Sequence, residues 1–367
     1  MNDTGDRSKP GQRRRSRRRR DAAVLRVSAP GNLLLCGEYA VLEPGGLGIA
    51  AAIPPRAAAE IRPAETPAVR CRIAAGGEHI YYPGRRAAAE TRLPEVCLTY
   101  LLQRGLVAAP PAAEIVVDTR AFFTSSGGKR GFGSSAAATV VCTAALLHAA
   151  GMARRRIDEV LSEHGVAIHR ELQRGRGSGY DVLASTIGGV VLFTGGRRPT
   201  AEPVSAAWLE GALLASAADS VRTTDAVGRY EAWKRRRPDE AAAFRSVSNE
   251  LVLRLAAARR RPEVLAELEK LATIGIELGE AIGVPARLPR ELVLRLGERF
   301  QRACETPGTL RGGPAARTAV CKALGAGNEL AVCIPYRRPH PTPAPDDCDT
   351  IQPLQVTSEG ISWEETE

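Results

Sequence analysis

A glycine- and serine-rich turn in the middle of the chain has the residue types of an anion site. Residues 129–138 read KRGFGSSAAA, and an Ala- and Leu-rich run without Gly or Pro follows. Gly131 and Gly133 allow a tight turn, and Ser134 or Ser135 can cap the helix that this composition predicts. Free N–H groups and the positive dipole end at such a helix start favour a polyphosphate. A simple serine cap is the alternative, and the motif is neither a P-loop nor a dinucleotide fingerprint.

A single carboxylate follows a second glycine-rich turn. Gly-Ser-Gly at 177–179 precedes Tyr180 and Asp181, and an apolar run comes next. A carboxylate held at the edge of a buried element is partly desolvated and fixed, which is what a general base needs. The alternative is that Asp181 only caps the helix after the turn. Glu171 lies earlier in the chain, and we expect it on a solvated helix face rather than at a metal ion.

Glycine-rich segments also occur near both ends of the chain. Near the start, APGN at 29–32 is followed by GEYAVLEPGG at 37–46, which by itself predicts a hairpin with a Pro-Gly turn. Near the end, KALGAGNEL at 322–330 precedes the apolar segment 331–334, which predicts a strand.

The rest of the chain predicts the elements that must hold these segments. Short alternating or apolar runs favour strands, and longer amphipathic runs that begin near Pro favour helices. The expected strands are 24–27, 33–36, 47–53, 58–61, 69–73, 80–82, 114–117, 188–193, 331–334 and 351–356. The expected helices are 95–103, 136–150, 155–165, 166–173, 238–258, 262–282 and 289–304, with a further hydroxyl-capped helix in 220–236. Strands with helices between them suit an α+β fold.

Charge and cysteine content narrow the function classes. The net charge of the 367-residue chain is +10, but residues 1–22 form a basic, low-complexity tail that we expect to be disordered. Nucleic-acid binding is therefore not expected beyond non-specific contacts of this tail. No apolar run is long enough to span a membrane. The eight cysteines lack metal-site spacing, which favours reduced, buried thiols in a cytoplasmic protein over disulfides or a zinc site.

These segments, in this order, resemble the motifs of the GHMP kinases, small-molecule kinases named after galactose, homoserine, mevalonate and phosphomevalonate. GFGSSA at 131–136 resembles their nucleotide-phosphate loop. APGN at 29–32 with GEYAV at 37–41 resembles their first motif, and 322–330 resembles the third. The Gly-Glu-Tyr form of the first motif and Gly-Ser-Gly-x-Asp-Val at 177–182 are most similar to phosphomevalonate kinases.

The resemblance, which covers residues 24–360, implies a GHMP kinase-like two-domain α+β fold. The N-terminal domain would be ribosomal-protein-S5-like and span 23–195, and the C-terminal domain would be ferredoxin-like and span 196–367. The resemblance implies ATP and Mg²⁺ as cofactors and 5-phosphomevalonate as the acceptor, with 5-diphosphomevalonate and ADP as products. A mevalonate kinase and a non-catalytic sensor with this fold are the alternatives. The protein is expected to be a monomer or a homodimer that does not act at a membrane.

The resemblance also assigns roles to residues of this chain. Asp181 and Lys129 would be catalytic, and Ser134 would contact Mg²⁺. The nucleotide would lie against the loop residues Gly131, Phe132, Gly133, Ser134, Ser135 and Ala136. The substrate would lie against Glu38, Tyr39, Ser178, Gly179, Gly325, Ala326 and Gly327. Candidates for holding a phosphate on the acceptor are Arg130, Arg174 and Arg176.

Two departures from the family pattern bear on catalysis. Asn32 stands where relatives mostly carry Lys or Arg, so a cation near the transferred phosphate must come from elsewhere or be dispensable. Asn328, Glu329 and Leu330 replace Gly, Gly and Asp of the third motif. This replacement makes the loop stiffer and leaves the role of that aspartate without a residue to carry it.

Overall fold

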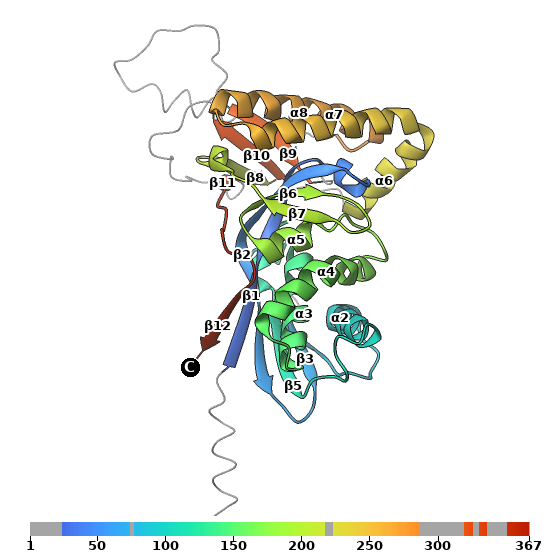
Figure 1. The fold of residues 1–367 in the computed structure, drawn as a ribbon, viewed down its shortest axis with the longest axis vertical. Coiled ribbons are helices and arrows are strands. Elements are labelled where there is room, and N and C mark those ends of the chain that lie inside the picture. Colours follow the sequence, from blue (N-terminus) through green and yellow to red (C-terminus); the bar gives the residue numbers. More distant parts are fainter. Residues whose placement is uncertain are drawn as a thin grey trace, which may run out of the picture.

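The computed structural model shows a chain built on two β-sheets with helices packed around them (Figure 1). The expected α+β architecture is thereby confirmed. The described residues are 24–73, 77–125, 127–216, 223–285, 319–325, 330–335 and 351–366.

The larger sheet contains eight of the described strands. Its order is β12-β1-β2-β5-β3-β4, with β6 beside β2 and β7 beside β6. The β3–β5 pair is parallel, and the other pairs are antiparallel. The strands are β1 (Val24–Cys36), β2 (Leu47–Pro63), β3 (Ala68–Ile73), β4 (Gly77–Tyr81), β5 (Ala113–Asp118), β6 (Val190–Thr194), β7 (Thr200–Pro203) and β12 (Ser362–Thr366).

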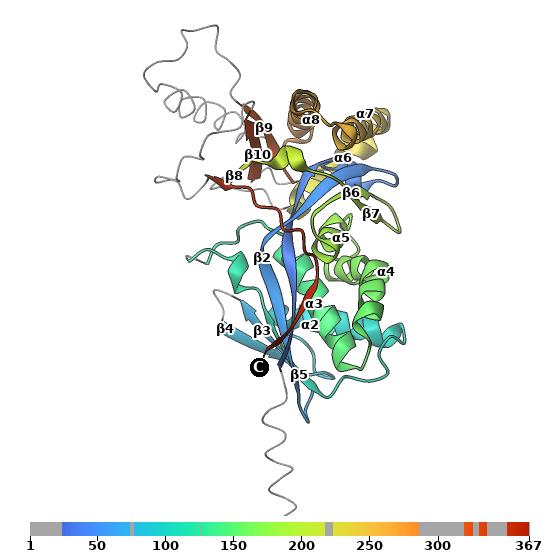
Figure 2. The ribbon, with the colours of Figure 1, turned by 60° about the vertical axis from the view of Figure 1, so that its left-hand side comes forward.

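Helices cover one face of this sheet, with α3 (Ser134–Ala149) at their centre (Figure 2). Helices α3 and α5 (Tyr180–Ile187) lie on β1 and β2, and α2 (Arg92–Gln103) and α4 (Arg154–Leu172) pack on α3. Every residue of α3 from 136 to 147 is buried. An Ala-rich helix that is apolar all round belongs in a core, so the start of α3 is fixed relative to the sheet.

The first strand is longer than its sequence pattern predicts. The pattern predicts separate segments at 24–27 and 33–36, but β1 runs continuously through both. Its pairing with β2 shifts register between Pro30 and Gly31, because Pro30 has no N–H to donate and an irregularity tolerates it. This path brings Gly31 against the glycine- and serine-rich turn at 129–136, where a Cβ on Gly31 would lie 2.5 Å from the carbonyl oxygen of Phe132.

Helix α4 joins the two helical segments expected at 155–165 and 166–173 into one. Gly165 lies inside this helix, and a Cβ there would lie 3.1 Å from Val182 Cγ1 of α5. The glycine therefore serves close helix packing and does not end the helix. No described helix is long and apolar enough to cross a bilayer.

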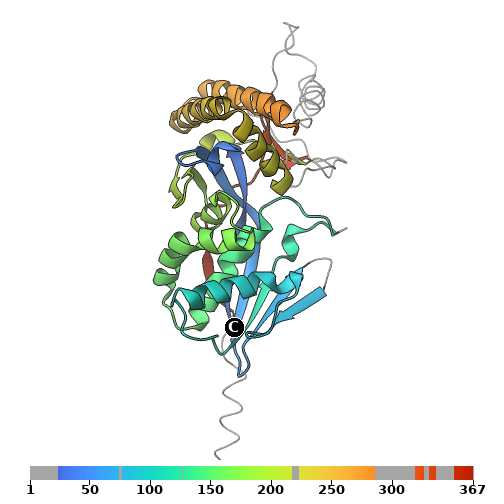
Figure 3. The same cartoon turned by 90° about the vertical axis from the view of Figure 1, so that its right-hand side faces the viewer.

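The second sheet holds four described strands in the order β11-β8-β10-β9, all antiparallel. Helix α8 packs against β9, and α7 packs against α8 and β2, as Figure 3 shows at its upper end. The helices expected at 238–258 and 262–282 are thereby confirmed, whereas the one expected at 289–304 lies outside the described residues. The elements are β8 (Leu213–Ser216), α6 (Thr223–Arg236), α7 (Pro238–Ala257), α8 (Arg261–Ile282), β9 (Ala319–Leu324), β10 (Leu330–Pro335) and β11 (Ile351–Pro353).

The chain returns to the larger sheet at its end, where β12 pairs with β1. Arg56 of β2 holds the segment before β12 by donating to the carbonyl oxygens of Glu359 and Gly360, at 3.1 and 2.6 Å. It also donates to Ser362 Oγ at 2.8 Å. Strand β7 belongs to the same sheet, although it follows residue 195. We propose the two domains that the sequence predicts, 23–195 and 196–367. Strands β7 and β12, which come from the second range, then add to the sheet of the first domain.

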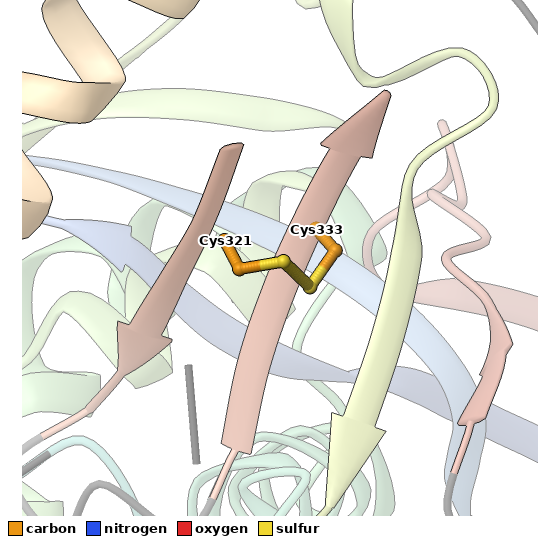
Figure 4. Close-up of a disulfide and its surroundings, with 2 residues drawn as sticks. All are labelled: Cys321 and Cys333. Carbon is orange, nitrogen blue, oxygen red and sulfur yellow. A yellow bond between two sulfur atoms is a disulfide. The ribbon is translucent and has the colours of Figure 1, made fainter. Parts of the chain in front are cut away.

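A disulfide joins Cys321 of β9 to Cys333 of β10 (Figure 4). The prediction of reduced thiols is therefore wrong for this pair. The register of the hairpin places the two cysteines directly opposite each other, with their Cα atoms 4.1 Å apart. Sequence spacing cannot show this pairing, because the spacing does not set the register of the two strands. Among the described residues, the free, buried cysteines are Cys36, Cys71, Cys97 and Cys142.

Candidate active site

The phosphate turn predicted at 129–136 rests on β1 and leads into α3. Gly133 is the N-cap of α3 with a left-handed φ of 72°, so neither of the two serines after it caps the helix. The side chain of Asn32 lies directly behind Gly133, is buried, and donates from Nδ2 to Ser185 Oγ at 3.1 Å. The first N–H groups of a helix have no partner within it and point outward along its axis. The start of α3 is therefore an anion site with a fixed backbone.

Gly133→Ala is expected to weaken MgATP binding by about tenfold or more, or at least about 1.4 kcal/mol. An alanine Cβ would lie 2.2 Å from Asn32 Nδ2, and Asn32 is held in place, so the turn must move. Gly151→Ala is the matched control, because Gly151 has a φ of 91° just beyond the other end of α3 but no atom lies within 4 Å of its Cβ position. Calorimetric titration with MgATP measures both variants. Equal weakening in the two would contradict the role of the close approach.

A second left-handed glycine places Asp181 at the start of α5. Gly179 is the N-cap of α5, with φ of 96°, and a Cβ there would lie 2.3 Å from Val166 Cγ1 of α4. The guanidinium of Arg170, also on α4, donates to the carbonyl oxygens of the two residues before Gly179, at 2.9 and 2.8 Å. Asp181 therefore lies in the first turn of a short helix whose entry is held by α4, and it is not the cap.

Asp181 is ionised and paired with a buried histidine. Its side chain is 21% exposed, and Oδ2 lies 3.4 Å from Nδ1 of His169, whose side chain is 3% exposed. Burial raises the pKa of Asp181, but the charge and hydrogen bond of His169 and the N–H of Val182 outweigh burial and hold this pKa below its ordinary value of 3.8. Burial lowers the pKa of His169, the Asp181 carboxylate raises it, and the balance lies above the ordinary value of 6.5. An ionised carboxylate of this kind can accept a hydrogen bond or a proton from an incoming hydroxyl.

The start of α3 and Asp181 border the same cavity, whose volume is about 260 Å³. The phosphate turn, the start of α5 with Asp181, and Gly325 of the third motif thus meet, although they lie far apart in the sequence. The predicted site residues that line this cavity are Lys129, Gly131, Phe132, Gly133, Ser134, Ser135, Ala136, Asp181 and Gly325.

Several residues predicted to contact substrate do not line this cavity. Ser178 and Gly179 are buried in the turn that positions Asp181. Glu38 and Tyr39 line a separate cavity against α7 and α8, and the Tyr39 ring packs on a tyrosine of α6 at a centroid distance of 5.1 Å. Ala326 and Gly327 lie outside the described residues. The substrate roles of all six stay predictions.

Glu38 forms a buried ion pair that joins the two sheets. Its carboxylate accepts a hydrogen bond from Lys322 Nζ of β9, and the two side chains are 13% and 4% exposed. Burial raises the pKa of Glu38 above its ordinary value of 4.5, while Lys322 and the backbone N–H groups of Glu38 and Gly325 lower it in part. Because Gly325 also lines the cavity of Asp181, this pair ties the start of the third motif to the end of β1.

No role in the site was predicted from the sequence for several residues that line the cavity. These are Asn32, noted only as a departure from the family, together with His169, Gln173 and Tyr180; Thr223, at the start of α6, lines it as well. The sequence spacing could have indicated two of these residues. His169 and Gln173 are spaced four apart, so they share one face near the end of a helix, and they directly precede the glycine turn that leads to Asp181.

Lys129 is the single Lys or Arg among the described residues that line the cavity. The three arginines proposed for the acceptor phosphate lie elsewhere. Arg130 lines a neighbouring cavity, Arg176 lines another, and Arg174 is an exposed residue in the turn after α4. In the described part of the chain, Lys129 is therefore the Lys or Arg that borders this cavity.

The oxygen atoms around the start of α3 fit Mg²⁺ that is carried by a nucleotide. The hydroxyls of Ser134 and Ser135 and the carboxylate of Asp181 line one cavity. Mg²⁺ takes oxygen ligands, typically one or two from protein carboxylates and the rest from phosphate and water. Among the described residues, no group of three or more His, Cys, Asp or Glu is placed to hold a metal by itself. The donor set therefore suits a metal that arrives with phosphate.

Comparison with known proteins gives the fold a family context. No protein-family model matches the sequence, and no curated protein matches it. In structure the chain is similar to a Lin0012 protein from Listeria innocua, with a TM-score of 0.70 and 17% identity, over 93% of this chain and 99% of that one. It is also similar to the Streptococcus pneumoniae phosphomevalonate kinase in complex with phosphomevalonate and AMPPNP, with a TM-score of 0.61, 18% identity, and coverage of 85% and 92%. For the Methanococcus jannaschii mevalonate kinase the TM-score is 0.60, with 14% identity and coverage of 87% and 92%.

These likenesses define the fold class. The chain has the two-domain α+β fold that phosphomevalonate and mevalonate kinases share, which confirms the fold expected from the motifs. Identities of 14–18% leave the particular substrate open.

Proposed function

We propose that the protein is an ATP-dependent phosphotransferase of the GHMP kinase type that acts on a small molecule. The observation that carries this proposal is the shared cavity, which an anion-binding helix start and an ionised, partly buried carboxylate both border. A protein that only binds a nucleotide has no need of such a carboxylate beside the phosphates. The likeness in fold to two mevalonate-pathway kinases supports the same class.

We propose a separate role in phosphoryl transfer for each group of residues that lines the cavity. The first N–H groups of α3, with the hydroxyls of Ser134 and Ser135, would hold the β- and γ-phosphates, and Lys129 would offset their charge. Asp181 would accept a hydrogen bond or proton from the acceptor and turn its oxygen toward the γ-phosphorus. A new oxygen–phosphorus bond forms while the bond from the γ-phosphorus to the bridging oxygen breaks, and ADP leaves. Mg²⁺, with Ser134 as its proposed protein ligand, would neutralise charge on the phosphate oxygens.

We propose 5-phosphomevalonate as the acceptor and 5-diphosphomevalonate as the product, in the mevalonate route to isoprenoids. The Gly-Glu-Tyr segment at 37–39 and Gly-Ser-Gly-x-Asp-Val at 177–182 support this choice. Mevalonate is the second candidate, and one observation favours it. The described lining of the cavity offers Lys129 as its only Lys or Arg, whereas a phosphorylated acceptor brings additional negative charge that needs partners.

ADP release by the purified full-length protein tests the proposal. The assay supplies MgATP and, in parallel, mevalonate, 5-phosphomevalonate or 5-diphosphomevalonate. We expect turnover with 5-phosphomevalonate alone. Turnover with mevalonate alone would establish the second candidate. Absence of turnover with all three, together with measurable MgATP binding, would contradict the enzyme proposal and favour a non-catalytic sensor.

A further inference from the structure

His169 connects parts of the cavity that come from three helices. Its Nε2 lies 3.1 Å from Ser135 Oγ in the first turn of α3, and its Nδ1 lies 3.4 Å from Asp181 Oδ2 in α5. The amide nitrogen of Gln173, at the end of α4, lies 3.4 Å from Nε2. All three partners line the cavity, while the side chain of His169 is almost completely buried behind them.

The carboxylate determines how this ring is protonated. An ionised Asp181 can only accept hydrogen bonds, so Nδ1 of His169 must carry a hydrogen. Nε2 is within hydrogen-bond distance of Ser135 Oγ, and it accepts from the hydroxyl when the ring is neutral and donates to it when the ring is charged. In both protonation states the contact fixes where Ser135 Oγ lies. Ser135 is exposed at the cavity, so its hydroxyl is held where a ligand can contact it.

A role in packing alone does not account for this ring. An imidazole buried between helices loses its hydration, and an apolar side chain would fill the same space without needing partners. Val166 and Ile168 on the same helix are buried in the apolar core and already anchor α4. His164 of α4 shows the contrast, because its Nδ1 lies 3.0 Å from the hydroxyl of Tyr100 and neither residue lines the cavity.

We propose that His169 is a positioning residue for phosphoryl transfer, which orients Asp181 through Nδ1 and holds the hydroxyl of Ser135 in place for the bound nucleotide through Nε2. The inference rests on the proposed function and assigns His169 a part in it. One rigid ring then holds the base and the phosphate-binding helix start in a single geometry. Such precision matters, because a misplacement of about 1 Å can cost about 10²-fold in rate.

Two amide substitutions separate the two contacts of the ring. The short side chain of His169→Asn reaches about as far as Nδ1, so it can still donate to Asp181 but loses Ser135. The longer His169→Gln reaches about as far as Nε2, so it can keep Ser135 but loses Asp181. We expect His169→Asn to raise the KM for MgATP by about tenfold with kcat little changed, and His169→Gln to lower kcat by about 10²-fold with KM little changed. Steady-state kinetics and calorimetric MgATP affinity measure the split.

His164→Asn is the matched control, and we expect its kcat and KM to equal those of the wild type. His169→Leu removes both contacts while filling the space, and it is expected to lose both kcat and MgATP affinity. The inference is overturned if a folded His169→Leu keeps both constants within about threefold of wild type. It is equally overturned if every variant at 169 loses activity only in proportion to a loss of folded protein, measured by its thermal midpoint.

Failure of the proposed function gives a different result. In that case the wild type turns over none of the acceptors, whereas failure of the inference leaves the wild type active. With an inactive wild type, the MgATP affinities of His169→Asn and His169→Gln still decide whether the ring orients Ser135. Weaker binding in His169→Asn alone supports that contact, and equal binding in both contradicts it.

Discussion

Asp181→Asn is expected to lower kcat by about 10²–10⁴-fold. The amide has the size of the carboxylate and can still accept the hydrogen bond from the N–H of Val182, which is 2.9 Å long in the wild type. It is neutral, however, and it does not accept a proton from the acceptor. The pKa of Asp181 is held below its ordinary value of 3.8, so the wild-type carboxylate is ionised at neutral pH. The decrease in kcat therefore reports the effect of removing this negative charge. ADP release at saturating MgATP gives kcat.

The control for this prediction is Glu171→Gln. Glu171 is an exposed residue of α4 that does not line the cavity, so removal of its charge is expected to leave kcat unchanged. MgATP affinity of Asp181→Asn, measured by calorimetry, checks that the phosphate turn is intact. Turnover of Asp181→Asn close to that of the wild type would show that Asp181 is not the base.

Glu38→Ala is expected to lower the free energy of unfolding by about 3–5 kcal/mol. The substitution leaves the ammonium of Lys322 buried, at 4% exposure, without its carboxylate partner. An uncompensated charge in such a place is costly because it has lost its hydration. The lost stability should come from the contact between the two sheets, since β9 carries Lys322 and Glu38 follows β1. Urea unfolding followed by circular dichroism measures the change.

Two further variants make this measurement specific. Glu60→Ala breaks the exposed pair with Arg62, in which the side chains are 35% and 51% exposed, and is expected to change stability by less than about 1 kcal/mol. The double variant Glu38→Ala with Lys322→Met removes both buried charges and should recover much of the loss. A loss for Glu38→Ala no larger than that for Glu60→Ala would contradict a buried, structural ion pair.

Local patterns predict the turns and most helices of this protein. The glycines of the phosphate turn and the Ala-rich run after Gly133 predict the turn and α3, because left-handed φ and helix propensity depend on a few neighbouring residues. The limits of the strands are less predictable. The pattern breaks at 28–32, yet β1 continues through it because β2 pairs with the whole length of the strand.

The sequence by itself determined which reactive groups are available to this protein: a glycine- and serine-rich helix start, a carboxylate after a glycine turn, and a lysine beside the first of these turns. Only the tertiary structure decided which groups meet. It placed His169 between Ser135 and Asp181, and it paired Glu38 with a lysine far along the chain. It also set the two hairpin cysteines opposite each other. The reason is that strand register and the packing of α3, α4 and α5 depend on many distant residues at once, so no short stretch encodes these contacts.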